Sequence, residues 1–213
     1  AEIEIVANNP GALSAANSSI YIEPLAPPPR LFVLGAGDDA KPVVTLAALL
    51  GWNVILADGR AQLARRERFN DAERVIPTAS IAELGITAKD AVVIMTHSYQ
   101  QDRAFLTGLL RSETIPGYIG LLGASHRSSL LLSEAAVILG RSVAECCERI
   151  WSPVGLDLGG EGAEAIALAV IAEIQAWHNG KLPASRRLTP ERVAAQIAGR
   201  TSAKYLPPQC SLK

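Results

Sequence analysis

A glycine-rich loop between an apolar run and a helical segment is the first feature of this sequence that could do chemistry. Gly35, Gly37 and Ala40 give the spacing G-x-G-x-x-A, and Asp58 ends the next apolar run. In a dinucleotide-binding loop the first glycine permits a tight turn and the second lets a phosphate approach the backbone. The later acidic residue accepts hydrogen bonds from a ribose. The pattern predicts a nucleotide-like ligand at Gly35, Ala36, Gly37 and Asp58.

Two aspartates stand where the phosphates of such a ligand would lie. Asp38 and Asp39 are expected in the first turn of the helix, where a carboxylate caps the N–H groups that a pyrophosphate needs. Asp39 is interpreted as an ordinary N-terminal helix acid that stabilises the dipole. Asp38 opposes a further anion by an energy on the order of kcal/mol, unless Lys41 or an arginine offsets its charge. A nicotinamide cofactor is therefore the weaker hypothesis.

Polar residues also follow the next two strong apolar runs, in the segments ADGR and MTHSYQQD. Ligands of a doubly wound sheet bind beyond the carboxyl ends of its strands. Arg60 either pairs with Asp58 or binds phosphate, and the sequence leaves the two alternatives even. Thr96, His97 and Asp102 fall between a strand and a helix, where His97 could transfer a proton or be structural. Asp102 is either part of this site or a charge on the helix surface.

A third polar segment, LLGASHR, opens another helix after an apolar run. Gly120 and Gly123 flank the expected turn, and Ser125, His126 and Arg127 begin the helix. N–H groups at a helix start bind anions, although a tight turn explains the glycines equally well. Gly120, Gly123 and Arg127 are therefore candidate binding residues.

Other kinds of site are not supported. The three histidines are far apart and there is no C-x-x-C pair, so a metal site is not expected. The adjacent Cys146 and Cys147 are expected to be reduced, core or half-buried thiols. No G-x-S-x-G motif supports a Ser-His-Asp hydrolase.

The composition favours one globular domain. The chain has 213 residues, of which 49% are hydrophobic and 19% charged, with a net charge of -1. This balance gives no broad field for nucleic acid or an anionic membrane. No apolar run approaches the roughly 20 residues of a membrane span, and residues 1–10 lack signal-peptide features. We expect a cytoplasmic protein.

Strands that alternate with helices must position these loops. Residues 1–29 are expected to form a short N-terminal β arm, 30–180 a Rossmann-type domain and 181–213 a tail with one short helix after Thr189-Pro190. The fold class is α/β, a doubly wound, mostly parallel sheet with helices on both faces. The expected strands are 31–35, 53–58, 74–77, 91–97 and 117–123, and the expected helices lie within 40–50, 99–112, 128–140 and 161–178.

Four ordered blocks resemble one family. They are PPPRLFVLGAGDDAKPVVTLAALLGWNVILADGR, VVIMTHSYQQD, GYIGLLGASHR and VGLDLGGEGAEAIALAVIAEIQA. Together they look like the C-terminal Rossmann-type half of the xanthine dehydrogenase accessory factor family (XdhC/CoxI-like). The matching site positions are Gly35, Gly37, Asp58, Arg60, Thr96, His97, Asp102, Gly120, Gly123, Arg127, Gly155, Asp157 and Gly159.

The resemblance implies a helper protein rather than an enzyme. Such a protein binds the molybdenum cofactor (molybdopterin), assists its sulfuration and delivers it to a xanthine dehydrogenase-like apoprotein. The implied partners are that molybdoenzyme, a sulfurase and a second copy in a homodimer. Family members usually carry an additional N-terminal domain, so the chain is expected to be a fragment or a short member whose partner supplies that half. An NAD(P)-binding oxidoreductase and a non-catalytic nucleotide-binding module stay open as alternatives.

Overall fold

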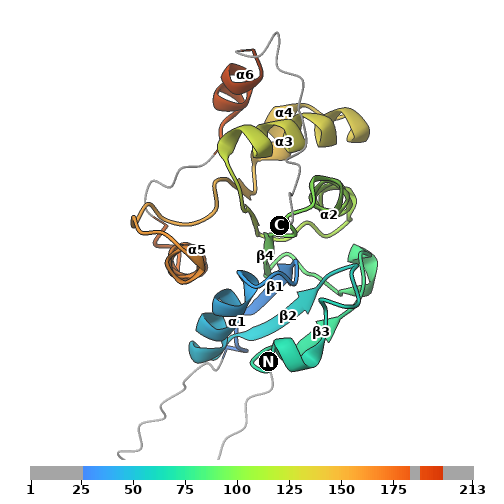
Figure 1. Ribbon diagram of the computed structural model, residues 1–213. Coiled ribbons are helices and arrows are strands. Elements are labelled where there is room, and N and C mark those ends of the chain that lie inside the picture. The colour runs from blue at the N-terminus through green and yellow to red at the C-terminus, as the bar shows by residue number, and fades with distance from the viewer. Residues whose placement is uncertain (1–25, 183–187, 199–213) are drawn as a thin grey trace, which may run out of the picture.

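A six-stranded parallel β-sheet runs through the described residues, 26–182 and 188–198, of this computed structural model (Figure 1). The strand order is β3-β2-β1-β4-β5-β6, and every neighbouring pair is parallel. This is the order of a doubly wound Rossmann-type sheet, as the sequence predicts. The strands are β1 (Arg30–Leu34), β2 (Asn53–Ala57), β3 (Arg74–Ile76), β4 (Ala91–Ile94), β5 (Tyr118–Leu121) and β6 (Ile150–Trp151).

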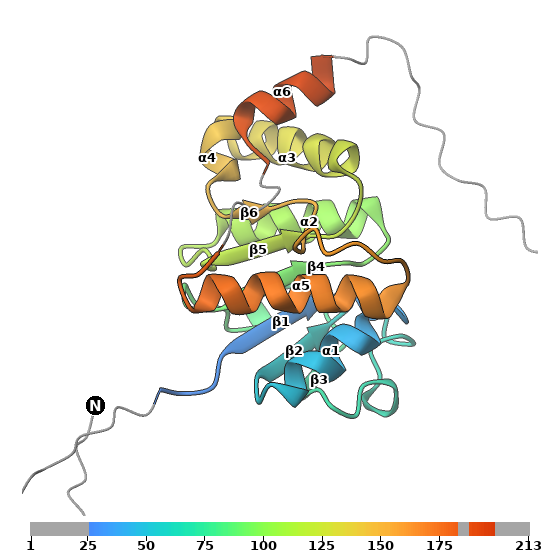
Figure 2. The ribbon, with the colours of Figure 1, turned by 90° about the vertical axis from the view of Figure 1, so that its left-hand side faces the viewer.

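Helices cover both faces of the sheet. Figure 2 shows α1 and α5 in front of the sheet, α2 behind it, α3 and α4 above it and α6 beyond α3. The side chains of α2, α3 and α4 belong to the core on the face opposite α1 and α5. Short 3-10 turns lie at Arg66–Arg68 and Ile81–Glu83. The helices are α1 (Ala40–Leu49), α2 (Tyr99–Arg111), α3 (Ser125–Leu139), α4 (Val143–Cys147), α5 (Ala163–His178) and α6 (Pro190–Ala198).

The strands are apolar throughout because both faces of the sheet are buried. In β1, Leu31 and Val33 belong to the core under α1 and α5, whereas Phe32 and Leu34 belong to the core under α2 and α3. Successive side chains of a strand point to opposite faces, so a strand between two helix layers reads as a continuous apolar run. This is why the sequence locates the central strands well.

Two short elements, β6 and α4, are not predicted from the sequence. The edge strand β6 has two residues, too few for any periodicity. The helix α4 begins with a capping box, in which Ser142 accepts a hydrogen bond from the Glu145 N–H and the Glu145 side chain bonds back to Ser142. The S-x-x-E spacing of that box could have indicated the helix.

The predicted ends of the chain are described only in part. Most of the expected arm, residues 1–25, lies outside the described residues. In the expected tail, α6 begins at Pro190, and Leu188 and Val193 are buried in the core beside α3. The segment 188–198 thus packs onto the sheet domain.

The sequence predicts one apolar stripe along α5 that packs on the sheet, and this prediction is partly wrong. The predicted stripe comprises Ala163, Ile166, Ala167, Val170, Ile174 and Trp177. Ala167, Val170 and Ile174 are buried as expected, but Ile166 is 39% exposed and Ile171 is buried as well. Because 3.6 residues make one turn, residues 167, 170, 171 and 174 share one face and residue 166 lies beside it.

A buried carboxylate joins α5 to the sheet. Glu173 is buried, and its Oε2 accepts hydrogen bonds from the Tyr118 hydroxyl at 2.6 Å and from the Gly155 N–H at 2.8 Å. The Tyr118 ring also stacks on Trp151 with 4.5 Å between ring centroids. Burial, and next the charge of Glu173, raise the pKa of the Tyr118 hydroxyl well above its ordinary value, so the hydroxyl remains a donor.

We expect Tyr118→Phe to lower the free energy of unfolding by about 1–3 kcal/mol, because it leaves a buried carboxylate short of one donor. Urea denaturation measures the change. Tyr99→Phe is the control, since the hydroxyl of Tyr99 interacts with Glu134, which is 42% exposed and open to water. Equal losses in the two variants would contradict a special role for the buried pair.

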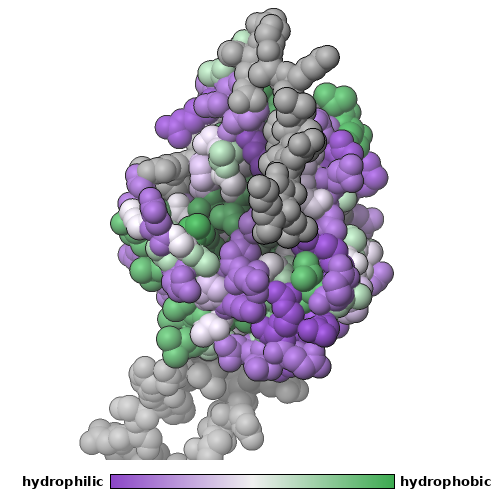
Figure 3. Space-filling model, viewed as in Figure 1, coloured by the Kyte–Doolittle hydropathy of each residue, from purple (hydrophilic) through white to green (hydrophobic). Residues whose placement is uncertain are grey.

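No helix in the described ranges is both long and apolar enough to span a membrane. Figure 3 shows hydrophilic residues over much of one face, with separate hydrophobic groups. One such group lies at the end of α3, where Val137 and Ile138 are exposed.

Candidate functional site

The carboxyl ends of the central strands bring the predicted residues of the first two segments together. The sheet order reverses between β1 and β4, so the chain leaves β1 toward α1 on one face and leaves β4 toward α2 on the other. This divergence is where doubly wound sheets bind ligands. The glycine loop after β1 and the polar segment after β4 meet at this point.

Gly35 lets these two segments approach closely. Its φ is +130°, and a Cβ there would lie 2.5 Å from the carbonyl oxygen of Met95. Its N–H donates to the carbonyl of Ala57 at 2.8 Å. Any side chain at this position would collide with backbone atoms, so the first glycine of the motif is required by the packing of β1 against β4.

Asp58 is fully buried and holds the glycine loop against Arg60. Its carboxylate accepts from the Ala36 N–H at 2.8 Å, the Arg60 N–H at 2.8 Å, and Arg60 Nε and Nη2 at 2.9 and 2.7 Å. Burial alone would raise the pKa of this carboxyl, but the hydrogen bonds from Arg60 and Ala36 bring the pKa below its ordinary value. Asp58 therefore remains charged and pairs with Arg60, which is the first of the two alternatives for Arg60, and phosphate binding by Arg60 stays a prediction.

A second buried carboxylate organises the segment after β4. Asp102 is buried, so the alternative of a charge on the helix surface is wrong. It accepts from the Thr96 N–H at 3.1 Å, from the Thr96 hydroxyl and from Arg127 Nη1. Arg60 Nη2 donates to the Thr96 carbonyl at 3.0 Å, which joins the two carboxylate clusters. The Arg127 guanidinium also lies over the Tyr99 ring, 5.6 Å from its centroid.

The two loop aspartates lie before the helix, not in its first turn as predicted. Helix α1 begins at Ala40, and Asp39 is its N-cap residue without a capping hydrogen bond from its side chain. Asp38 is 81% exposed and pairs with Lys41 at 2.7 Å and Arg68 at 2.9 Å. Its charge is thus offset by Lys41 and by an arginine.

Asp39 instead contacts His97 across the divergence of β1 and β4. His97 Nε2 lies 2.7 Å from Asp39 Oδ2, and the His97 side chain is 63% exposed. His97 has a φ of 60°, a left-handed conformation that is uncommon outside glycine. Asp39 Oδ1 is buried without a hydrogen-bond partner among the described residues, and a Cβ on Gly37 would lie 2.5 Å from it.

The carboxylate of Asp39 therefore lies over the glycine at which a pyrophosphate would approach the backbone. The arginines at this edge are already paired with aspartates. Like charges at a few ångströms repel by about 1–4 kcal/mol near a protein surface. The glycine loop in this arrangement does not suit an added pyrophosphate.

The residues of the third predicted segment, LLGASHR and the preceding glycine, have three different structural roles. Gly120 lies inside β5, not at the turn as predicted, and a Cβ there would meet Val154 at 2.4 Å. Its role is to make room for that side chain. Gly123 has a φ of +130°, which the turn into α3 requires. Arg127 belongs to the Asp102 cluster rather than to an open helix start.

Asp157 lies in the glycine-rich segment that precedes α5. It lines a cavity of about 330 Å³ together with Gly155, Gly159 and Gly160. The glycine-rich segment thus forms part of the wall of a cavity.

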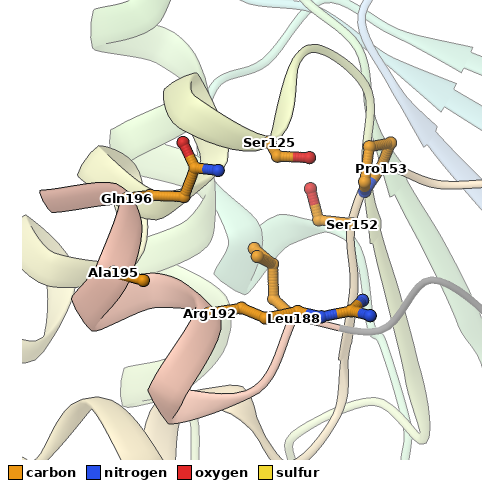
Figure 4. Close-up of a pocket in the computed structure, with 7 residues that line it drawn as sticks. All are labelled: Ser125, Ser152, Pro153, Leu188, Arg192, Ala195 and Gln196. Carbon is orange, nitrogen blue, oxygen red and sulfur yellow. The ribbon is translucent and has the colours of Figure 1, made fainter. Parts of the chain in front are cut away.

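A pocket of about 420 Å³ was missed by the sequence analysis (Figure 4). It lies between the start of α3, the segment after β6 and α6. Its lining comes from positions far apart in the chain, which is why no local motif indicates it. The lining residues are Ser125, Ser152, Pro153, Leu188, Arg192, Ala195 and Gln196.

The part of the chain that the structure describes contains no metal cluster, and both of its cysteines are buried. Within residues 26–182 and 188–198, no group of three or more His, Cys, Asp or Glu side chains could hold a metal ion. Cys146 and Cys147 are buried and unbridged, as predicted. Burial raises the pKa of the Cys146 thiol, which makes it a poor nucleophile.

The geometry and the four sequence blocks agree with one protein family. The model of the XdhC Rossmann domain matches residues 31–174. The chain belongs to this family. The matched residues include all six strands, apart from Arg30 at the start of β1.

Relatives of known sequence support this membership. The chain is 36% identical over 160 residues to a protein of Bacillus subtilis (strain 168) that is named as a probable xanthine dehydrogenase subunit, covering 74% of this chain and 45% of that protein. It is 30% identical over 161 residues to the uncharacterized protein YqeB of Escherichia coli K12, covering 73% and 28%. The chain thus spans less than half the length of these relatives.

A solved structure gives the same result for the fold. The crystal structure of a xanthine dehydrogenase from Bacillus halodurans matches with a TM-score of 0.64 and 31% identity, over 75% of this chain and 45% of that one. The parallel Rossmann-type sheet is therefore shared with a related chain of solved structure.

Proposed function

We propose that the chain is the Rossmann-type part of a helper protein that binds the molybdenum cofactor and delivers it to a xanthine dehydrogenase-type apoenzyme. The observation that carries the proposal is the family match over residues 31–174. The 36% identity to a probable component of a xanthine dehydrogenase supports the client class. In this proposal the protein acts in the cytoplasm as a homodimer, with the apoenzyme and a sulfurase as partners.

The arrangement at the divergence of β1 and β4 favours a helper role over a nicotinamide-dependent oxidoreductase. Asp58, which would bind a ribose in a dinucleotide fold, uses both carboxylate oxygens for Ala36 and Arg60. Asp39 lies over Gly37, where the pyrophosphate would approach. Both observations weigh against a nicotinamide dinucleotide in this arrangement of the loop.

In this proposal the phosphate end of the molybdenum cofactor needs hydrogen-bond donors from the protein. Arg60 and Arg127, the basic residues that the sequence suggests for this role, are hydrogen-bonded to Asp58 and Asp102. They fit as supports of the loops better than as phosphate ligands. In this proposal the phosphate end is bound by other donors than these two guanidinium groups.

The test is a calorimetric titration of the whole chain, under anaerobic conditions, with molybdenum cofactor and separately with NADH and NADPH. We expect saturable binding of the molybdenum cofactor and no heat from either nicotinamide. A second assay adds the loaded chain to a cofactor-free xanthine dehydrogenase-type enzyme and measures the rate at which activity appears. The proposal predicts faster activation than with free cofactor alone.

Binding of a nicotinamide in place of the molybdenum cofactor would contradict the proposal. The matched control is Asp39→Asn, which removes the negative charge over Gly37 and should leave binding of the molybdenum cofactor unchanged or stronger. A gain of nicotinamide binding in this variant alone would show that Asp39 is what excludes the dinucleotide.

A further inference from the structure

The pocket between α3, β6 and α6 differs chemically from the glycine loop. It lies at the carboxyl side of β5 and β6, where the chain passes to α3 and α5. Its volume of about 420 Å³ is within the range of small-molecule sites. Leu188 and Pro153 provide apolar surface, whereas Ser125, Ser152, Arg192 and Gln196 provide polar groups.

Ser152 supplies a hydroxyl at the base of this pocket. The residue is fully buried in the fold, yet its side chain lines the pocket. In Figure 4 the Ser152 hydroxyl points toward the hydroxyl of Ser125. The hydrogen bond of Ser152 Oγ to the Leu121 carbonyl is long, at 3.4 Å. A buried hydroxyl held so weakly by the protein can turn to donate to a ligand oxygen.

Ser125 begins α3, and the helix adds donors on the same side. The N-cap residue, Ala124, has no side-chain acceptor for the first N–H groups of the helix. The Ser128 N–H donates to the Ala124 carbonyl, which closes the first turn. The first N–H groups of an α-helix point out of its start. They add a partial positive charge beside the two hydroxyls.

A guanidinium group, that of Arg192, also lines the pocket. Arg192 and Gln196 project from α6 into the region between this helix and the two serines (Figure 4). None of the described lining residues is acidic. In the glycine loop, by contrast, the aspartates are part of the site itself. A guanidinium, an amide, two hydroxyls and N–H groups around an apolar wall suit a phosphate on an organic molecule.

We propose that this pocket is a binding site for a small molecule that carries a phosphate monoester. The phosphate would accept from Ser152, Ser125 and Arg192, and the organic part would contact Leu188 and Pro153. This inference goes beyond the proposed function, because it concerns any ligand with that group. It assigns the recognition of the ligand to Ser152 and Arg192, which lie outside the glycine motif.

The test uses phenyl phosphate as the probe, with inorganic phosphate and benzoate as comparisons, in titrations of the whole ¹⁵N-labelled chain. We expect phenyl phosphate to shift the amide signals of residues 125–127 and 152 and to bind more tightly than inorganic phosphate. Arg192→Gln should raise the dissociation constant about 10-fold or more, since it removes a charge-assisted contact. Ser152→Ala should raise it about 5-fold, the size of one neutral hydrogen bond.

The matched control is Arg111→Gln. Arg111 lines a second pocket of the same volume, about 420 Å³, with Gly85 and Ser112 and without the paired serines. This variant should leave binding of phenyl phosphate unchanged. Equal binding of benzoate would overturn the choice of a phosphate, and shifts confined to other residues or insensitive to Arg192→Gln would overturn the site.

These outcomes are separable from those of the proposed function. Phenyl phosphate binding at this pocket together with no binding of molybdenum cofactor would refute the proposed function and support the site. Binding of molybdenum cofactor that neither Arg192→Gln nor phenyl phosphate weakens, in a chain that does not bind phenyl phosphate, would support the function and refute the site.

Discussion

Asp58→Ala should lower the free energy of unfolding by about 3–5 kcal/mol, the cost of breaking a buried pair by removing one partner. The variant loses the acceptor for the Ala36 N–H. It also loses the acceptor for the backbone N–H, Nε and Nη2 of Arg60. It leaves the guanidinium of Arg60 beside the buried Thr96 carbonyl without its carboxylate. Urea denaturation followed by circular dichroism measures the loss.

Asp38→Ala is the matched control for this prediction. Asp38 lies in the same loop region and also pairs with an arginine, Arg68, but it is 81% exposed. Water replaces its contacts and salt screens them, so we expect a change close to the error of the measurement. A loss for Asp38→Ala that matches the loss for Asp58→Ala would contradict the importance of burial.

The difference in stability between the parent chain and Asp58→Ala should depend on pH, and the sign of this dependence follows from the pKa of Asp58. The pKa of Asp58 is lower in the folded protein than its ordinary value of about 3.9. A carboxyl with a depressed folded pKa stabilises the protein above its unfolded pKa, and this contribution disappears as the pH falls through the folded pKa. The stability difference between the parent chain and Asp58→Ala should therefore be constant from about pH 8 to pH 5. It should shrink below about pH 4, which denaturation at several pH values would reveal.

The sequence predicts the fold well for a physical reason. A parallel strand that is covered on both faces must be apolar at every position, and short runs such as 91–94 are therefore visible without any partner. Glycines after these runs then indicate the turns that lead into the helices. The sequence also places the candidate residues at one edge, because parallel strands all end on the same side of the sheet.

The roles of those residues depend on contacts that no local pattern contains. Asp39 meets His97 58 positions away, and Asp102 meets Arg127 25 positions away. Whether Arg60 binds a phosphate or a neighbouring carboxylate depends on the burial of Asp58, which is a property of the folded chain. The pocket of Ser152 and Arg192 is still harder to foresee, because it forms only when α6 packs on α3.

Gly35→Ala should lower the free energy of unfolding by about 3 kcal/mol or more, which combines a strained backbone with overpacking. The left-handed φ of +130° disfavours any L side chain, and the new Cβ would lie 2.5 Å from Met95 O and 2.9 Å from Thr96 Cα. Those atoms belong to the backbone that follows β4, so relief requires β1 and β4 to separate where the glycine loop meets His97.

Gly51→Ala separates the two costs. Gly51 has a φ of +77°, but a Cβ there would have no heavy atom within 4 Å, so this variant carries the backbone strain alone. We expect it to cost about 1 kcal/mol. If thermal or urea denaturation instead gave Gly35→Ala no greater loss than Gly51→Ala, the loop would be free to move away from Met95. The close approach of Asp39 to His97 would then be one arrangement of the loop among others, and a pyrophosphate could reach Gly37 in the arrangements without it.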